Sequence, residues 1–234
     1  ESGTLRAVLT GCGAKALGGE LQGEARYLDE FEAWGLGARH RLAQVEPPCE
    51  RFLLVSLGTG TSALLVEAER TRRVGGTALG GGTLLGLAGS LLGTRDFGEI
   101  LELARQGDRG NVDLLVEDLY PEGLPTLPGA LNAASFGKLA QGLPSQPADR
   151  AHALLGLLGE NVALLASTLA AQHDVTHVAF GGGVLRDNVQ LRDLLVAVCR
   201  MSGQQPLLLE DGEYTGALGA LVHAGLQPST LGAD

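Results

Sequence analysis

The chain has 234 residues, enough for one large domain or two closely joined lobes whose core needs no disulfide framework. Its formal net charge of −10 at pH 7 opposes binding to a phosphate backbone, so nucleic acid is not an expected partner. The sequence has neither an uninterrupted apolar run of membrane-spanning length nor a secretory signal. We therefore expect a soluble, cytoplasmic protein without membrane attachment.

The cysteines are few and unpaired by spacing. Cys12, Cys49 and Cys199 form an odd set without the short intervals of a structural zinc site. Each is predicted to be a reduced, buried and inert thiol.

The first part of the chain predicts two strands and two helices, the first helix over the segment LGGELQG between the strands. Residues 5–10 form a short apolar run that closes on a glycine turn, and residues 25–31 form a second strand-like run that ends in acidic side chains. Helix-compatible spacing covers residues 33–45 and stops at two prolines. Residues 1–50 are accordingly predicted to be the remainder of an amino-terminal lobe.

The second lobe is predicted to span residues 51–234. A hairpin opens it, with a strand at 51–56, the glycine loop LGTGTS and a returning strand from residue 63. A helical insertion is expected at about 84–170. Within it the patterns predict helices at 83–93, 97–105 and 112–119, a surface segment at 121–147 with Asn132 as a helix cap, and a long amphipathic helix at 149–171.

The remaining elements alternate between strand and helix. Strands are predicted at THVAFGGG and PLLLE, and helices at 187–199 and 215–224. Strands that alternate with helices indicate an α/β fold.

Glycine, at 36 residues, is the most pointed feature of the composition. It gathers in LGTGTS, RRVGGTALGGG, FGGGVLRDN and DGEYTGALGA, each predicted at a strand end or before a helix. A helix amino terminus behind such a loop presents free N–H groups and a favourable dipole to phosphate. The spacing is neither a P-loop nor a dinucleotide fingerprint, so the four segments together predict a nucleotide cleft assembled from separate loops.

These segments also carry a family resemblance. LGTGTS, RRVGGTALGGGTLLGL, QGDRGNVDLLVEDLY, AASFGK, FGGGVLRDN and YTGALGA occur in the order and approximate spacing of type II pantothenate kinases, and the chain resembles that family over nearly its whole length. The resemblance implies a two-lobed ribonuclease-H-like fold of the actin and sugar-kinase type. The resemblance also implies that the amino-terminal lobe of this fold is incomplete in this sequence.

The resemblance implies catalytic roles for two residues. Glu30 in DEFEA matches the family's general base, which accepts the proton of the attacking hydroxyl, with Asp29 and Glu32 as adjacent alternatives. Arg73 matches the arginine beside the substrate carboxylate and the transferring phosphate, and Arg72 is its alternative.

Binding residues follow in the same way. Thr59 and Ser62 match hydroxyls that contact pantothenate, and Tyr214 is a further candidate for the substrate or adenine pocket. The positions expected on the nucleotide side are Gly58, Thr59, Gly60, Gly80, Gly81, Gly82, Thr83, Gly182 and Gly216.

The implied activity is ATP-dependent phosphorylation of pantothenate with Mg²⁺. The resemblance also implies a homodimer, joined through the long helix at 149–171 and the middle helical segment. One departure bears on the activity: the family's leading Asp-x-Gly-Gly-Thr loop is not found ahead of residue 5, and about thirty or forty residues of a usual lobe would hold it. Two alternatives therefore stay open. In the first, the chain is a kinase that phosphorylates another small hydroxylated metabolite. In the second, it is an inactive relative that binds nucleotide or coenzyme A.

Overall fold

The computed structural model describes residues 5–21, 23–43, 49–68, 70–125 and 128–225. A five-stranded mixed sheet forms its centre, in the order β5-β4-β3-β8-β9. β3 pairs antiparallel with β4 and β4 with β5, whereas β3 with β8 and β8 with β9 are parallel. The strands are β3 (Phe52–Leu57), β4 (Thr61–Glu67), β5 (Arg70–Thr77), β8 (His177–Gly181) and β9 (Gln205–Leu208).

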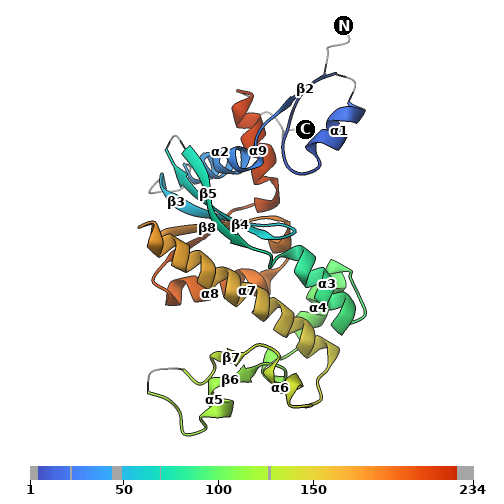
Figure 1. Ribbon diagram of the computed structural model, residues 1–234, viewed down its shortest axis with the longest axis vertical. Coiled ribbons are helices and arrows are strands. Elements are labelled where there is room, and N and C mark those ends of the chain that lie inside the picture. Colours follow the sequence, from blue (N-terminus) through green and yellow to red (C-terminus); the bar gives the residue numbers. More distant parts are fainter. Residues whose placement is uncertain (1–4, 22, 44–48, 69, 126–127, 226–234) are drawn as a thin grey trace.

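Helices cover both faces of this sheet (Figure 1). On one face pack α7 (Pro147–Gln172) and α8 (Val189–Met201), and on the other packs α2 (Glu30–Leu42), which in turn contacts α9 (Thr215–His223). This arrangement confirms the predicted α/β class.

The sequence of β3 explains why it lies at the centre. Leu53, Val55 and Leu57 belong to the core beneath α7, whereas Phe52 and Leu54 belong to the core beneath α2. Successive side chains of a strand point to opposite faces, so a strand covered on both sides must be apolar throughout.

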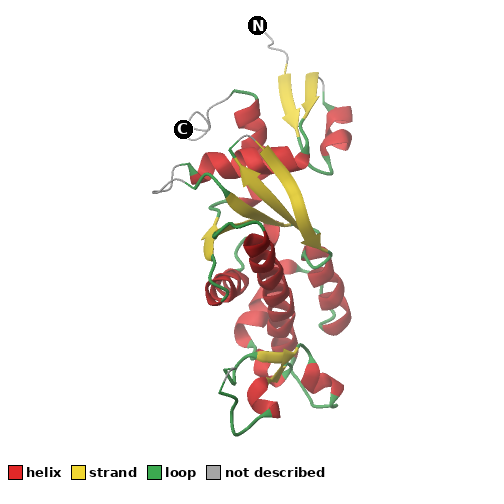
Figure 2. Cartoon of the chain, turned by 60° about the vertical axis from the view of Figure 1, so that its left-hand side comes forward, coloured by secondary structure: helices red, strands yellow, loops and turns green. Residues whose placement is uncertain are grey.

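Two smaller parts extend the molecule at its ends (Figures 1 and 2). At one end β1 (Leu5–Leu9) and β2 (Gly23–Tyr27) form a parallel pair, joined by α1 (Ala14–Glu20). Beside α7 lie α3 (Gly81–Leu91) and α4 (Phe97–Gln106), which are followed in the chain by η1 (Arg109–Asn111). At the other end lie β6 (Leu114–Leu115), α5 (Val116–Leu119), β7 (Asn132–Ala134) and α6 (Gly137–Ala140). Single 3₁₀ turns η2 (Gly183–Leu185) and η3 (Gly212–Tyr214) follow β8 and β9.

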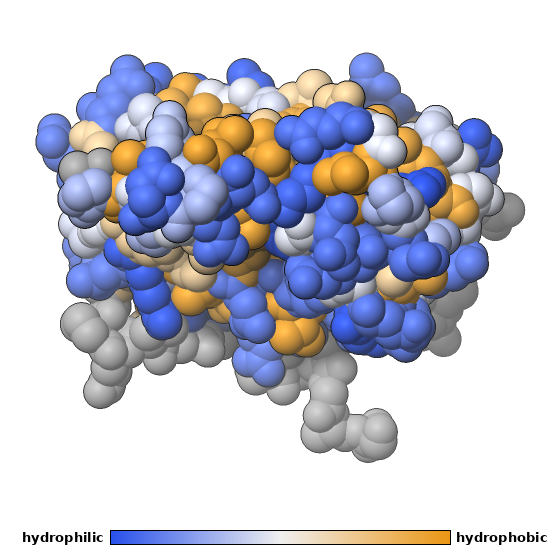
Figure 3. All heavy atoms as spheres, turned by 90° about the horizontal axis from the view of Figure 1, so that it is seen from below, coloured by the Kyte–Doolittle hydropathy of each residue, from blue (hydrophilic) through white to orange (hydrophobic). Residues whose placement is uncertain are grey.

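The long helix α7 confirms the clearest sequence prediction. By length and composition it could cross a membrane, but 67% of its most apolar window is buried inside the molecule. A buried core helix has this composition. Seen along the long axis from the α5–α6 end, the surface mixes hydrophilic and hydrophobic residues (Figure 3).

Four local predictions were wrong. Gly75 and Gly76 lie within β5, paired with β4, and are not part of a loop. The helix expected at 112–119 is confined to α5, because Leu114 and Leu115 pair with β7. Asn132 lies in that strand and caps no helix; α6 begins later, after Phe136 adopts φ 59°.

The fourth wrong prediction is that Cys12 is buried. Cys12 is exposed in the turn between β1 and α1. Cys199 is buried as predicted and Cys49 is half-buried, and burial raises the pKa of both thiols.

The predicted boundary at residue 50 falls before β3. α2, which precedes it, packs against core residues of the sheet that follows it. The division at residue 50 stays a prediction.

Candidate functional site

A pocket of about 350 Å³ lies where the amino terminus of α2 meets the β3–β4 hairpin and β5. Six residues with predicted roles line it: Glu30, Gly58, Thr59, Gly60, Ser62 and Arg73. They are far apart in sequence and come from α2, the hairpin and β5. We call this cavity the acceptor pocket.

Glu30 reaches the pocket because of where α2 begins. The Asp29 side chain caps the helix by accepting hydrogen bonds from the amides of Phe31 (2.9 Å) and Glu32 (3.0 Å). This leaves Glu30 in the first turn, where a carboxylate interacts favourably with the helix dipole. Of the three candidate acids, Glu30 lines the pocket, Asp29 serves as the cap and Glu32 is not among the lining residues.

The register of β5 directs Arg73 into the pocket. Ala63 pairs with Gly75 and Leu64 with Arg73, so Val74 is an extra residue in a bulge. Bulges re-aim side chains at such positions. A Cβ at Gly76 would lie 2.6 Å from the Arg73 guanidinium, so the missing side chain leaves room for it. Arg72 is not among the lining residues.

Backbone hydrogen bonds join the first two glycine segments, LGTGTS and RRVGGTALGGG, beside the acceptor pocket. The amide of Gly81 donates to the carbonyl oxygen of Gly58 at 2.8 Å, and the amide of Gly82 donates to that of Thr59 at 2.9 Å. The Thr83 hydroxyl donates to the carbonyl oxygen of Ala78 at 2.8 Å. The expectation of free amides at the start of α3 is therefore wrong for Gly81 and Gly82, because the hairpin loop already accepts from them.

The other glycine segments join the same region. A Cβ at Gly80 would lie 2.6 Å from Cα of Gly60, and a Cβ at Gly182, where φ is +116°, would collide with the carbonyl oxygen of Leu57. A Cβ at Gly212 would lie 3.0 Å from Cα of Gly181. Segments predicted to form one cleft thus converge in space, and glycine is required at these contacts.

The other predicted site residues do not line the acceptor pocket: Gly80, Gly81, Gly82, Thr83, Gly182, Tyr214 and Gly216. Tyr214 is 58% exposed in η3 and does not line the pocket. Gly216 lies behind it, where a Cβ would be 3.3 Å from Nε1 of Trp34. Their roles stay predictions.

Sequence reasoning missed several lining residues: Cys12, Phe31, Trp34, Ser56, Thr61, Leu64 and Thr77. Trp34 could have been found, because it follows Glu30 by four residues and therefore shares its helix face. The Thr61 hydroxyl is occupied, since it donates to the carbonyl oxygen of Leu79 at 2.7 Å.

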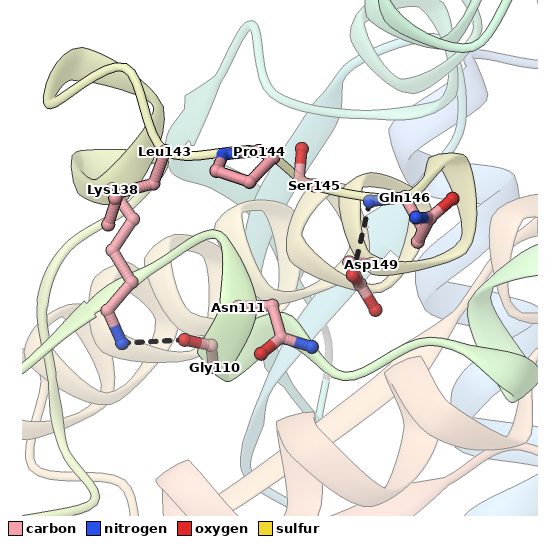
Figure 4. Close-up of a pocket in the computed structure, with 8 residues that line it drawn as sticks. All are labelled: Gly110, Asn111, Lys138, Leu143, Pro144, Ser145, Gln146 and Asp149. Carbon is pink, nitrogen blue, oxygen red and sulfur yellow. Dashed lines mark hydrogen bonds between the residues drawn. The ribbon is translucent and has the colours of Figure 1, made fainter.

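A second pocket, of about 500 Å³, lies beside the amino terminus of α7, between η1 and the segment that contains α6 (Figure 4). Its polar groups are already paired: Lys138 Nζ donates to the carbonyl oxygen of Gly110 at 2.7 Å and forms an ion pair with Asp118. Asp149 accepts from the amides of Asp108 at 2.9 Å and Gln146 at 3.2 Å. These hydrogen bonds and the ion pair stabilise the fold and leave the groups occupied.

A third pocket, between the β1–β2 pair and α9, is mainly apolar and holds none of the predicted site residues.

The motif QGDRGN builds a buried ion network near the second pocket. Arg109 pairs with the fully buried Asp113 at 2.7 Å and with Glu160 at 3.0 Å. Burial lowers the pKa of Arg109, but the hydrogen bonds and charges of Glu160 and Asp113 outweigh burial and raise it. The ion pair between Arg109 and Glu160 thus connects the segment that contains the motif to α7.

Comparison with solved structures defines the class of fold. The chain is similar to component A of the (R)-2-hydroxyglutaryl-CoA dehydratase of Acidaminococcus fermentans, with a TM-score of 0.57 at 19% identity over 92% of this chain and 74% of that one. A ROK family glucokinase from Streptomyces griseus, in complex with glucose and AMPPNP, gives a TM-score of 0.51 at 14% identity, over 88% of this chain and 70% of that one. The fold is therefore of the predicted actin and sugar-kinase type.

Sequence comparison narrows the class to a family. The family described as Fumble matches residues 31–223. Type II pantothenate kinases of Staphylococcus epidermidis and Bacillus cereus are each 33% identical, over 91% and 96% of this chain and 81% and 83% of their own. The chain belongs to the type II pantothenate kinase family.

Proposed function

We propose that this protein phosphorylates pantothenate with ATP to give 4′-phosphopantothenate, the first step of coenzyme A biosynthesis. One observation carries the proposal: Glu30, Thr59, Ser62 and Arg73 line the same acceptor pocket. The relatives named type II pantothenate kinase, which align over most of the chain, support the choice of acceptor.

The proposed chemistry uses the two charged groups of the pocket. The Glu30 carboxylate accepts the proton of the acceptor hydroxyl as its oxygen attacks the γ-phosphorus of ATP. The Arg73 guanidinium pairs with the acceptor carboxylate and holds the acceptor near the charge of the transferring phosphate. Thr59 and Ser62 supply hydroxyls for the polar groups of the acceptor.

The glycine segments fit a nucleotide. The missing side chains at Gly80 and Gly182 let the backbones of these segments pack against Gly60 and Leu57, which brings the segments together as one surface for the phosphates. The amides of Gly81 and Gly82 are occupied, and contact there would come from the backbone surface of Gly58, Thr59 and Gly60.

Mg²⁺ is proposed to be bound mainly by the nucleotide. Among the described residues no group of three or more His, Cys, Asp and Glu side chains could hold a metal. Mg²⁺ commonly uses one or two carboxylates together with substrate phosphates. When bound, it would neutralise charge on the β- and γ-phosphates.

Two other functions remain as alternatives. A kinase of another small hydroxylated metabolite would use the same base and arginine, and a panel of acceptors competing with pantothenate would reveal it. An inactive relative would bind ATP or coenzyme A without turnover, and calorimetry beside a turnover assay would separate it from the enzyme.

The deciding experiment is ATP-dependent formation of phosphopantothenate, identified by product mass, with Glu30→Gln in parallel. We expect product from the wild type and a rate lower by about 10²- to 10⁴-fold in the variant, the usual contribution of a general base. Glu32→Gln is the matched control, because it removes a carboxylate from the same turn but outside the pocket. Equal rates for Glu30→Gln and wild type would reject Glu30 as the base.

We further propose a cytoplasmic homodimer. Asn161, Leu164 and Thr168 are exposed along one face of α7, and Leu164 is 54% exposed. Leu164→Glu is expected to shift the mass measured by light scattering from dimer to monomer. A monomeric wild type would exclude this interface.

A further inference from the structure

Trp34 is the only tryptophan of the chain. It lies one helical turn after Glu30 on α2, where side chains four apart share a face. Both side chains line the acceptor pocket. One side of the indole therefore faces the position proposed for the acceptor.

The same indole also lies close to Gly181 and to Gly216, a position expected on the nucleotide side. Its Cζ3 atom lies 3.1 Å from the position that a Cβ of Gly181 would occupy, and its Nε1 atom lies 3.3 Å from the corresponding position at Gly216. Gly181 ends β8 and Gly216 is in the first turn of α9. The ring thus occupies space that side chains at both glycines would need.

The helix that carries Trp34 is held firmly. A Cβ at Gly37 would collide with the carbonyl oxygen of Thr215, and a Cβ at Gly219 would collide with that of Ala33. The backbones of α2 and α9 are therefore in direct contact, and a close-packed interior transmits displacement rather than absorbing it. The backbone that carries Trp34 can therefore move away from the glycine turns only if one of these helices moves.

We propose that Trp34 is a positioning residue that couples the acceptor pocket to the nucleotide turns. This rests on the proposed function. The rigid indole sets the separation between the helix that carries Glu30 and the turns at Gly181 and Gly216, and so aligns the acceptor hydroxyl with the γ-phosphate. Alignment of this kind affects the rate of transfer more than the binding of either substrate alone.

Because Trp34 is the only tryptophan, intrinsic fluorescence reports on its surroundings directly. A nonhydrolysable ATP analogue and pantothenate, added separately, are each expected to change the emission of the wild type. Emission that stays constant while calorimetry records saturation by the ATP analogue would overturn the proposal.

Kinetics tests positioning against packing. Trp34→Ala is expected to lower kcat by about 10²-fold, with smaller changes in either KM, and Trp34→Phe should recover most of the rate. Leu36→Ala is the matched control, because Leu36 is a half-buried side chain of the same helix outside the pocket. If Trp34→Ala and Leu36→Ala lower kcat equally at equal folded fraction, the role is only structural.

A double-mutant cycle tests the contact itself. Gly216→Ala adds a methyl group that would press on the indole, so it should weaken binding of the ATP analogue several-fold. The same change in the Trp34→Phe background should be milder, because the smaller ring lacks Nε1. Additive effects would overturn the coupling.

The two failures can be told apart. If the wild type forms no phosphopantothenate, the proposed function is contradicted. The fluorescence titration with the ATP analogue and the double-mutant cycle on its binding would still decide the role of Trp34. A wild type that binds no nucleotide analogue would overturn both.

Discussion

The amide nitrogen of Gly81 donates a 2.8 Å hydrogen bond to the carbonyl oxygen of Gly58, which ties the start of α3 to the β3–β4 hairpin. The hairpin belongs to the sheet, whereas α3 begins the segment between β5 and α7. Because the hairpin loop also lines the acceptor pocket, the shape of the pocket depends on this junction.

Gly80→Ala should open the junction. Its methyl group would lie 2.6 Å from Cα of Gly60 and 2.7 Å from the carbonyl oxygen of Thr59, which are backbone atoms with little freedom to move. We expect a loss of about 1–3 kcal/mol in the free energy of unfolding, as for other overpacked sites, and weaker ATP binding. Denaturant titration and calorimetry measure both.

Gly86→Ala is the control for that substitution. Gly86 lies in the same helix with no atom within 4 Å of its Cβ position. Removing a helix-interior glycine should stabilise the protein by about 0.5–1 kcal/mol. Equal destabilisation by both variants would contradict the importance of the Gly60 contact.

Arg73→Lys tests the proposed anion contact. Lysine keeps the charge but loses the planar fork, so KM for pantothenate should rise about tenfold or more, the effect of one lost charge-assisted hydrogen bond. Arg72→Lys changes the neighbouring residue outside the pocket and should leave KM within about twofold, as surface changes usually do. Steady-state kinetics decides, and a reversed order of effects would favour Arg72.

Arg109→Met tests the buried ion network. It leaves Asp113, which is fully buried, without its cation, and breaking a buried pair in this way typically costs about 3–5 kcal/mol. The exposed Arg105–Glu102 pair is the control, where Arg105→Met should change the free energy of unfolding little, because solvent screens the pair. Urea unfolding of the two variants is the measurement, and similar losses would contradict a structural role for the network.

Asp149 predicts a pH dependence of stability. The amides of Asp108 and Gln146 hold its pKa below the usual value, with the Asp108 hydrogen bond as the larger cause. Because the pKa is lower in the folded state, the contribution is present at neutral pH and is lost as the pH falls below about 4, the usual aspartate value.

Asp149→Asn should therefore reduce the difference in the free energy of unfolding between pH 7 and low pH. Denaturant titrations at several pH values measure it. Asp193→Asn, an exposed aspartate on α8, is the control and should leave the pH profile unchanged. Profiles that coincide for Asp149→Asn and wild type would contradict this account.

The sequence by itself determined the elements with strong periodicity or continuous apolar character. β3, β4 and α7 appeared where their patterns placed them, because a core covered on both faces leaves few residue types that fit. The glycine segments predicted a cleft, since close backbone approach requires glycine, whereas Glu30 in DEFEA was assigned by the resemblance to the kinase family.

The tertiary structure decided what depended on partners distant in sequence. Whether Gly75 and Gly76 belong to a loop or a strand depended on pairing with β4, and Asn132 became a strand residue because β6 lay beside it. Only packing brought Trp34 between the acceptor pocket and the glycine turns, because the space at Gly181 and Gly216 is defined by elements far along the chain. Local propensity is a weak prior at such positions, where contacts made by the folded chain decide the outcome.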